Sequence, residues 1–139
     1  MRAVDTGVIV AAFASWHEAH DVAVAELAQR PRAAAHSMVE TVSVLTRLPA
    51  PHRAPLELVA SFLEAAFDQE PLTLDGAQTS RLLVERLPAL AVSGGAVYDA
   101  LIAETVRAAD GVLVTLDRRA LTTYDRVGVR SVLLDDGSL

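Results

Sequence analysis

Short apolar runs alternate along the chain with longer segments in which apolar residues recur every three or four positions. The short runs predict strands, and the periodic segments predict amphipathic helices. The predicted strands are residues 2–5, 33–36, 71–74, 111–116 and 131–134. The predicted helices are residues 6–14, 18–30, 37–48, 55–69, 75–87, 93–109 and 118–125. This alternation is typical of a three-layer α/β/α domain with a mainly parallel central sheet.

Local signals refine this division of the chain. Asp75 and Gln78 are spaced as a capping box at the start of a helix, and Ser37 and Glu40 have the same spacing. Residues 135–136 predict a solvated turn near the C-terminus. The length of 139 residues and the hydrophobic content of 52% fit one domain with its own core, so residues 1–139 are predicted to form a single domain.

Two acidic residues follow predicted strands directly. Asp5 ends the first apolar run, and Asp117 comes after the run that finishes at Leu116. The carboxyl ends of parallel strands meet at one edge of a sheet, where sites of α/β proteins gather. We therefore expect these two carboxylates to lie close together. Each of them could instead serve only as the N-cap of the following helix.

Two further acids lie on helices that look apolar. Asp99 shares a helical stripe with Ile102 and Ala103, and no cationic residue stands three or four positions away. A buried carboxylate is costly unless it is paired or binds metal, so Asp99 indicates either a distant arginine or a cation. Glu40 lies in a similarly apolar helix, although its capping-box spacing from Ser37 offers a purely structural explanation.

Four converging acids would need a compensating cation. Carboxylate oxygens select Mg²⁺ or Mn²⁺ over softer metals, and such a cation can activate water against a phosphodiester. The sequence therefore predicts that Asp5, Glu40, Asp99 and Asp117 surround a divalent cation of a kind that can act on a phosphodiester.

Composition excludes several classes of function. The net charge of −6 argues against a protein that coats nucleic acid by bulk charge, although a bound cation would supply positive charge locally. The chain has no cysteine, which excludes disulfides, thiolate zinc sites and cysteine nucleophiles. Neither a secretory signal nor an apolar stretch of roughly 20 residues is visible, so we expect a cytoplasmic protein without a membrane span.

The order and flanking residues of the acids resemble those of the PIN domain, in particular the VapC toxins of bacterial toxin–antitoxin systems. The resemblance covers nearly the whole chain, and all four acidic positions agree. The segments that carry it are VDTG at 4–7, MVE at 38–40, YDALIA at 98–103 and LVTLDRR at 113–119. Gly7 stands where many members of the family carry serine. This difference affects none of the four acidic positions.

The resemblance implies the toxin of a type II toxin–antitoxin system, an endoribonuclease that needs Mg²⁺, with Mn²⁺ as a possible substitute. It implies that Asp5 and Asp99 bind the metal directly, and that Asp117 binds it directly or through water. Glu40 would position or deprotonate the attacking water. Thr6 and Thr115 would support the carboxylates. It further implies an RNA substrate, a homodimer, and a cognate VapB-type antitoxin that places a basic side chain among the acids.

Other functions remain open at this stage. A catalytically silent PIN fold could act as a binding module for an antitoxin or RNA, and metal binding would separate the two. A receiver domain would need a lysine, which the chain lacks, and neither a GxGxxG fingerprint nor a P-loop is present. A dehalogenase-like phosphatase would need a second aspartate at Gly7. Arg118 and Arg119 could contact RNA phosphate or be ordinary surface charges.

Overall fold

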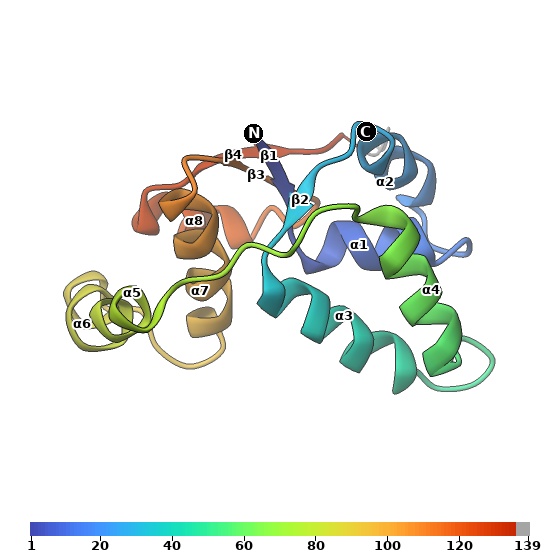
Figure 1. Cartoon of the computed structure of the whole chain (residues 1–139), viewed down its shortest axis with the longest axis horizontal. Coiled ribbons are helices and arrows are strands. Elements are labelled where there is room, and N and C mark those ends of the chain that lie inside the picture. Colours follow the sequence, from blue (N-terminus) through green and yellow to red (C-terminus); the bar gives the residue numbers. More distant parts are fainter. Residues whose placement is uncertain (136–139) are drawn as a thin grey trace.

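A computed structural model describes residues 1–135 of the chain (Figure 1). Its centre is a four-stranded, all-parallel sheet in the order β2-β1-β3-β4. The strands are β1 (Arg2–Val4), β2 (Arg32–Ala33), β3 (Val112–Thr115) and β4 (Arg130–Leu133). The predicted parallel sheet is thus confirmed. Residue 136, part of the predicted C-terminal turn, lies outside the described residues.

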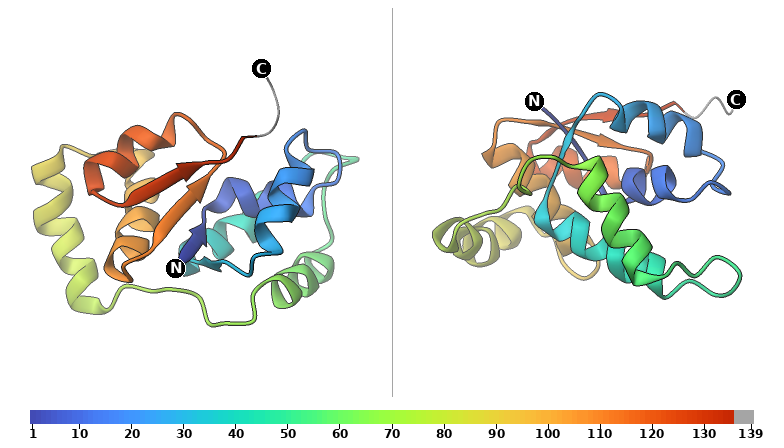
Figure 2. Two further views of the ribbon diagram at one scale, coloured as in Figure 1. Left: turned by 90° about the horizontal axis from the view of Figure 1, so that it is seen from above. Right: turned by 45° about the vertical axis from the view of Figure 1, so that its right-hand side comes forward.

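Helices cover both faces of the sheet. They are α1 (Thr6–Phe13), α2 (His20–Leu27), α3 (Ala35–Thr46), α4 (Leu56–Ala66), α5 (Gly76–Arg81), the π-helical turn η1 (Leu82–Arg86), α6 (Leu87–Leu90), α7 (Ala96–Ala108) and α8 (Ala120–Val127). Figure 2 shows an extended segment running from α4 to α5, which takes the chain from one helical group to the other. Within residues 1–135, none of the helices is long and apolar enough to cross a bilayer.

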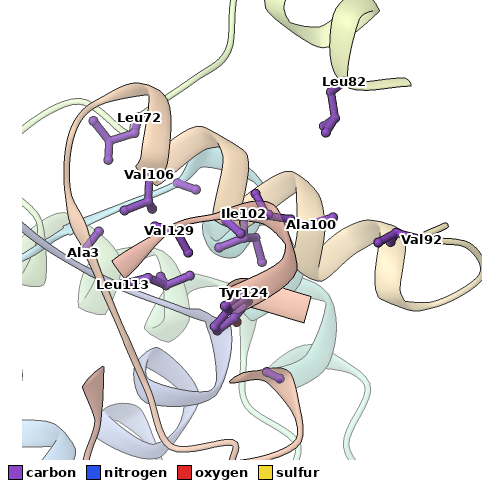
Figure 3. Packing of buried hydrophobic residues seen from close by; sticks show 14 of the residues in the cluster. Ala3, Leu72, Leu82, Val92, Ala100, Ile102, Val106, Leu113, Tyr124 and Val129 are labelled. Carbon is purple, nitrogen blue, oxygen red and sulfur yellow. The ribbon is translucent and has the colours of Figure 1, made fainter. Parts of the chain in front are cut away.

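The strands divide their side chains between two apolar cores, because successive residues of a strand point to opposite faces. Leu113 of β3 packs with α7 and α8, including Ile102 and Tyr124 (Figure 3). Its neighbour Val114 packs with α1, α2 and α4 on the other face. The sheet and its two helical layers confirm the three-layer prediction. The carboxyl ends of β1 and β3 lie between these layers. Asp5 follows β1 and Asp117 follows β3.

The predicted strand at residues 71–74 is not formed. It contributes only one isolated parallel bridge, between Ala34 and Leu72. Pro71 has no amide proton, so the residue before Leu72 cannot donate to a ladder. The same bridge ends β2 early, since the Ala35 amide donates to the Leu72 carbonyl at 2.8 Å. As a result α3 begins at Ala35 instead of residue 37, and His36 belongs to a helix.

Helix ends also differ from the prediction. The Asp75–Gln78 capping box is present, with Asp75 Oδ1 accepting from the Gln78 amide at 2.7 Å. The helix it starts continues past residue 87 to Leu90 through η1. This wider turn precedes Pro88, whose missing amide could not bond to the carbonyl four residues earlier. The helix predicted at residues 18–30 is shorter and spans His20–Leu27.

Candidate functional site

All four predicted acids line one small cavity of about 110 Å³, together with the side chain of Tyr124. Asp5 directly follows β1, and its amide donates to the Val114 carbonyl of β3 at 3.0 Å. Asp117 follows β3 by two residues. Glu40 comes from α3 and Asp99 from α7. The structure therefore brings the four side chains together, while their catalytic and metal-binding roles stay predictions.

Asp5 is buried, with only 5% of its surface exposed. Its Oδ1 accepts a hydrogen bond from the Val8 amide at 3.3 Å, so it does serve as the N-cap of α1. Its Oδ2 accepts a hydrogen bond from the Tyr124 hydroxyl at 2.8 Å. Asp5 thus both caps α1 and lines the cavity. Burial raises the pKa of Asp5; hydrogen bonds from Thr115, Tyr124 and Val8 oppose the shift, and the charge of Asp117 adds to it.

Asp99 is half-buried on the stripe of α7 that it was predicted to share with Ile102 and Ala103, both of which are buried. Among residues 1–135 its carboxylate has neither a hydrogen bond nor an ion pair, so no distant arginine accounts for it. Burial raises the pKa of Asp99 to about 6, and the negative charges of Asp5, Glu40 and Asp117 contribute to the rise.

Glu40 is not part of a capping box, which corrects the structural explanation offered by its spacing from Ser37. The N-cap of α3 is Ala34, and Ser37 lies inside the helix with its hydroxyl buried and unpartnered among the described residues. Glu40 Oε1 instead accepts a hydrogen bond from the Thr6 hydroxyl at 3.3 Å. The same oxygen lies 3.2 Å from His36 Nε2, a close contact without hydrogen-bond geometry.

Asp117 is exposed at the rim of the cavity, and backbone hydrogen bonds fix the loop that carries it. Its Oδ1 accepts from the Arg119 amide at 2.9 Å, and its own amide donates to the Thr115 hydroxyl at 3.0 Å. Thr6 thus contacts the Glu40 carboxylate and Thr115 that of Asp5, while their supporting role stays a prediction. Arg118 and Arg119 are exposed beside the cavity, and their contact with RNA phosphate stays a prediction.

The chain pairs its other buried acids with arginine. Glu26, 2% exposed, accepts from the Arg2 guanidinium at 2.6 and 3.1 Å. Glu104 contacts both Arg86 and Arg107 at 2.8 Å. Asp5 is comparably buried but has no such partner within residues 1–135. Within residues 1–135, Asp5 and Asp99 thus lack the arginine partners that Glu26 and Glu104 have.

The oxygen donors of the cluster suit a hard divalent cation. As the side chains stand, no group of three or more acidic or histidine residues within residues 1–135 is arranged to hold a metal ion. Mg²⁺ nevertheless needs only one or two protein carboxylates, because it usually keeps several waters. Asp5 and Asp99, which line the same cavity, are the pair predicted for this role. The donor chemistry of the cavity thus fits a magnesium-type ion that is held partly by water.

Sequence reasoning missed three residues at this site. Tyr124 lies on the buried stripe of α8 with Ala120 and Val127, a spacing that could have predicted its inward direction. The spacing of four between His36 and Glu40 could have indicated their contact once both were placed in one helix. Tyr98, next to Asp99, stacks on His36 with the ring centroids 5.3 Å apart.

Comparison with known proteins agrees with this arrangement. The sequence matches the PIN domain over residues 2–127. The chain therefore belongs to the PIN domain family, and within that family it is of the VapC type. It is 46% identical to ribonuclease VapC40 of Mycobacterium tuberculosis over 134 residues, which cover 96% of this chain and 99% of that protein. It is 41% identical to ribonuclease VapC27 of the same species over 133 residues, which cover 94% and 95%. No solved structure matches it significantly.

Proposed function

We propose that this protein is the toxin of a type II toxin–antitoxin system and acts as an Mg²⁺- or Mn²⁺-dependent endoribonuclease. One observation carries the proposal: four carboxylates surround a single cavity, and no cation from residues 1–135 is paired with the two innermost ones, Asp5 and Asp99. The two relatives described above are both named ribonucleases, which supports the same activity here.

In this proposal Asp5 and Asp99 would hold the cation. A bound ion of this kind stabilises charge developing on a phosphodiester and lowers the pKa of a bound water. Asp5 is suited to the role because the Val8 amide and the Tyr124 hydroxyl fix its orientation, while each carboxylate oxygen keeps a second lone pair that can bind the cation. The Asp99 carboxylate has no competing partner among residues 1–135 and is therefore free to bind.

The other two acids would act on the attacking water and on the cation. Glu40 Oε1 is occupied by the Thr6 hydroxyl, so Oε2 is the oxygen that can accept a proton from the attacking water. Asp117 Oδ1 is held by the Arg119 amide, which leaves Oδ2 to bind the cation directly or through water. These assignments place three carboxylates around the cation and leave Glu40 to act on the attacking water.

We further propose that the protein forms a homodimer in the cytoplasm and is inhibited by a VapB-type antitoxin. Asp5 and Asp99, which have no cationic partner within residues 1–135, could receive a guanidinium group, because charge-assisted hydrogen bonds between arginine and carboxylate are strong. An antitoxin arginine placed in this cavity would compete with the metal for Asp5 and Asp99.

Growth and metal binding together test the proposal. Producing the protein alone should slow bacterial growth, and Asp5→Asn should not. The matched control is Asp110→Asn, which changes a fully exposed acid outside the cavity and should remain toxic. Equal arrest by wild type and Asp5→Asn would contradict the site assignment. Calorimetric titration with Mn²⁺ should show binding to wild type, whereas a protein that binds no Mn²⁺ would be a silent binding module.

A further inference from the structure

An exposed aromatic side chain stands at the margin of the acidic cavity. Tyr98 directly precedes Asp99 on α7, and 56% of its surface is exposed. Of the six aromatic residues of the chain, all of which the structure describes, only Tyr98 and Trp16 are largely exposed. Exposing a large ring costs the free energy that its burial would provide. Tyr98 therefore calls for a reason that core packing does not supply.

The Tyr98 ring is supported from one side. It stacks on His36 with a centroid separation of 5.3 Å and an interplanar angle of 2°. The His36 ring is in turn 3.2 Å from Glu40, one of the four acids that line the cavity. The stacked His36 ring restricts the orientation of the phenol. His36 and Glu40 belong to α3, so this contact joins Tyr98 of α7 to the acidic cluster. The result is a flat, backed aromatic surface beside the cavity.

We propose that Tyr98, backed by His36, is a stacking platform for one unpaired nucleobase of an RNA strand whose scissile phosphate lies among the four acids. The proposal rests on the ribonuclease function proposed above and adds the base-binding subsite. Proteins that bind single-stranded RNA stack splayed bases on aromatic rings, which any base can satisfy with its π face. The phenol thus supplies affinity without requiring a particular sequence.

Electrostatics favours a base-directed contact at this position. The protein has a net charge of −6, and the cavity concentrates four carboxylates. These groups repel RNA phosphates and so weaken binding through the backbone. Stacking depends little on charge and can hold the strand next to the cluster despite this repulsion. A second copy of the chain covering Tyr98 is the competing occupant.

Direct binding separates these possibilities. The probe is a fluorescein-labelled single-stranded RNA decamer, titrated in the presence of Ca²⁺ and followed by fluorescence anisotropy. Tyr98→Ala should weaken binding by on the order of 10-fold, and Tyr98→Phe should bind like wild type, because stacking needs the ring alone. The matched control is Trp16→Ala. Trp16 is 49% exposed and packs on His52, but it lines a separate cavity and should leave binding unchanged.

A decamer of abasic ribose phosphate provides the decisive comparison, because it keeps the phosphates and removes the bases. Wild type and Tyr98→Ala should bind the abasic strand equally. Equal binding of the ordinary decamer by wild type and Tyr98→Ala would overturn the proposal. Weaker binding of the abasic strand by Tyr98→Ala than by wild type would also overturn it. A shift of Tyr98→Ala from dimer to monomer in sedimentation, with binding per monomer unchanged, would assign the ring to a subunit contact instead.

The proposed function can fail separately from this inference. If wild type cuts cellular RNA with added metal and Tyr98→Ala binds and cuts equally well, the ribonuclease stands and the stacking platform falls. If wild type neither binds the decamer nor cuts any RNA with metal, both proposals fall. Circular dichroism of the Tyr98 variants checks that the exposed substitution leaves the fold intact.

Discussion

Replacing Asp99 by asparagine should stabilise the metal-free protein at neutral pH while removing its function. The pKa of Asp99 rises from 3.8 to about 6 on folding because burial and three neighbouring acids disfavour its charge. The folded protein therefore binds the Asp99 proton more tightly than the unfolded chain does. Stability is lost as the pH rises through the window from 3.8 to about 6, and the loss is complete at pH 7.

The size of the effect follows from that shift. A rise from 3.8 to about 6 corresponds to a penalty of about 3 kcal/mol in the free energy of unfolding at pH 7. Asp99 is only half-buried, so solvent screening reduces this to about 1–2 kcal/mol. Asparagine has nearly the same shape and no charge, so the variant should regain this amount. The expected increase in melting temperature is about 5 °C for a domain of this size.

Urea denaturation in EDTA at pH 4.5 and pH 7.5 measures the difference. Asp99→Asn should exceed wild type in stability at pH 7.5 and approach it at pH 4.5, where much of the wild-type carboxyl is protonated. Adding Mg²⁺ should stabilise wild type and leave the variant unchanged, because ligand binding to the folded state alone stabilises it. An Asp99→Asn variant that is less stable than wild type at pH 7.5 in EDTA would refute the reasoning.

Three further substitutions test the structure around the site. Tyr124→Phe leaves Asp5 Oδ2 buried without its donor and should cost about 1–3 kcal/mol in thermal unfolding; an unchanged melting temperature would contradict the hydrogen bond. Arg2→Met leaves the Glu26 carboxylate buried and unpaired, and should cost about 3–5 kcal/mol in urea unfolding. A cost well below about 1 kcal/mol would mean the pair is weak. Ser37→Ala should leave the free energy of unfolding unchanged or raise it. A loss of about 1 kcal/mol would indicate that Ser37 caps α3 after all.

Much of the site could be predicted from periodicity. The apolar runs before Asp5 and Asp117 place both residues at strand ends, and a parallel sheet brings such ends together. The helical stripe of Ile102 and Ala103 carries Asp99 toward the interior. These inferences succeed because strand and helix periods determine which way a side chain points.

What could not be predicted depends on contacts between distant segments. Tyr124 and Asp5 are separated by 119 residues, and no local pattern reports their hydrogen bond. The sequence places the start of α3 at Ser37, but the helix begins at Ala35, directly after the bridge between Ala34 and Leu72. Because the helix starts earlier than predicted, Glu40 lies beyond its first turn and accepts a hydrogen bond from Thr6 instead of capping the helix. Tertiary hydrogen bonds thus overrode a plausible local signal.

The most direct test of the central claim is cleavage of total bacterial RNA by purified wild type and Asp99→Asn, each in EDTA, in Mg²⁺ and in Mn²⁺. We predict that wild type cuts RNA only when a divalent metal is added, and that folded Asp99→Asn does not cut under any of these conditions. Cleavage by wild type that persists in EDTA, or cleavage by Asp99→Asn at the wild-type rate, would contradict a metal-dependent ribonuclease centred on these four acids.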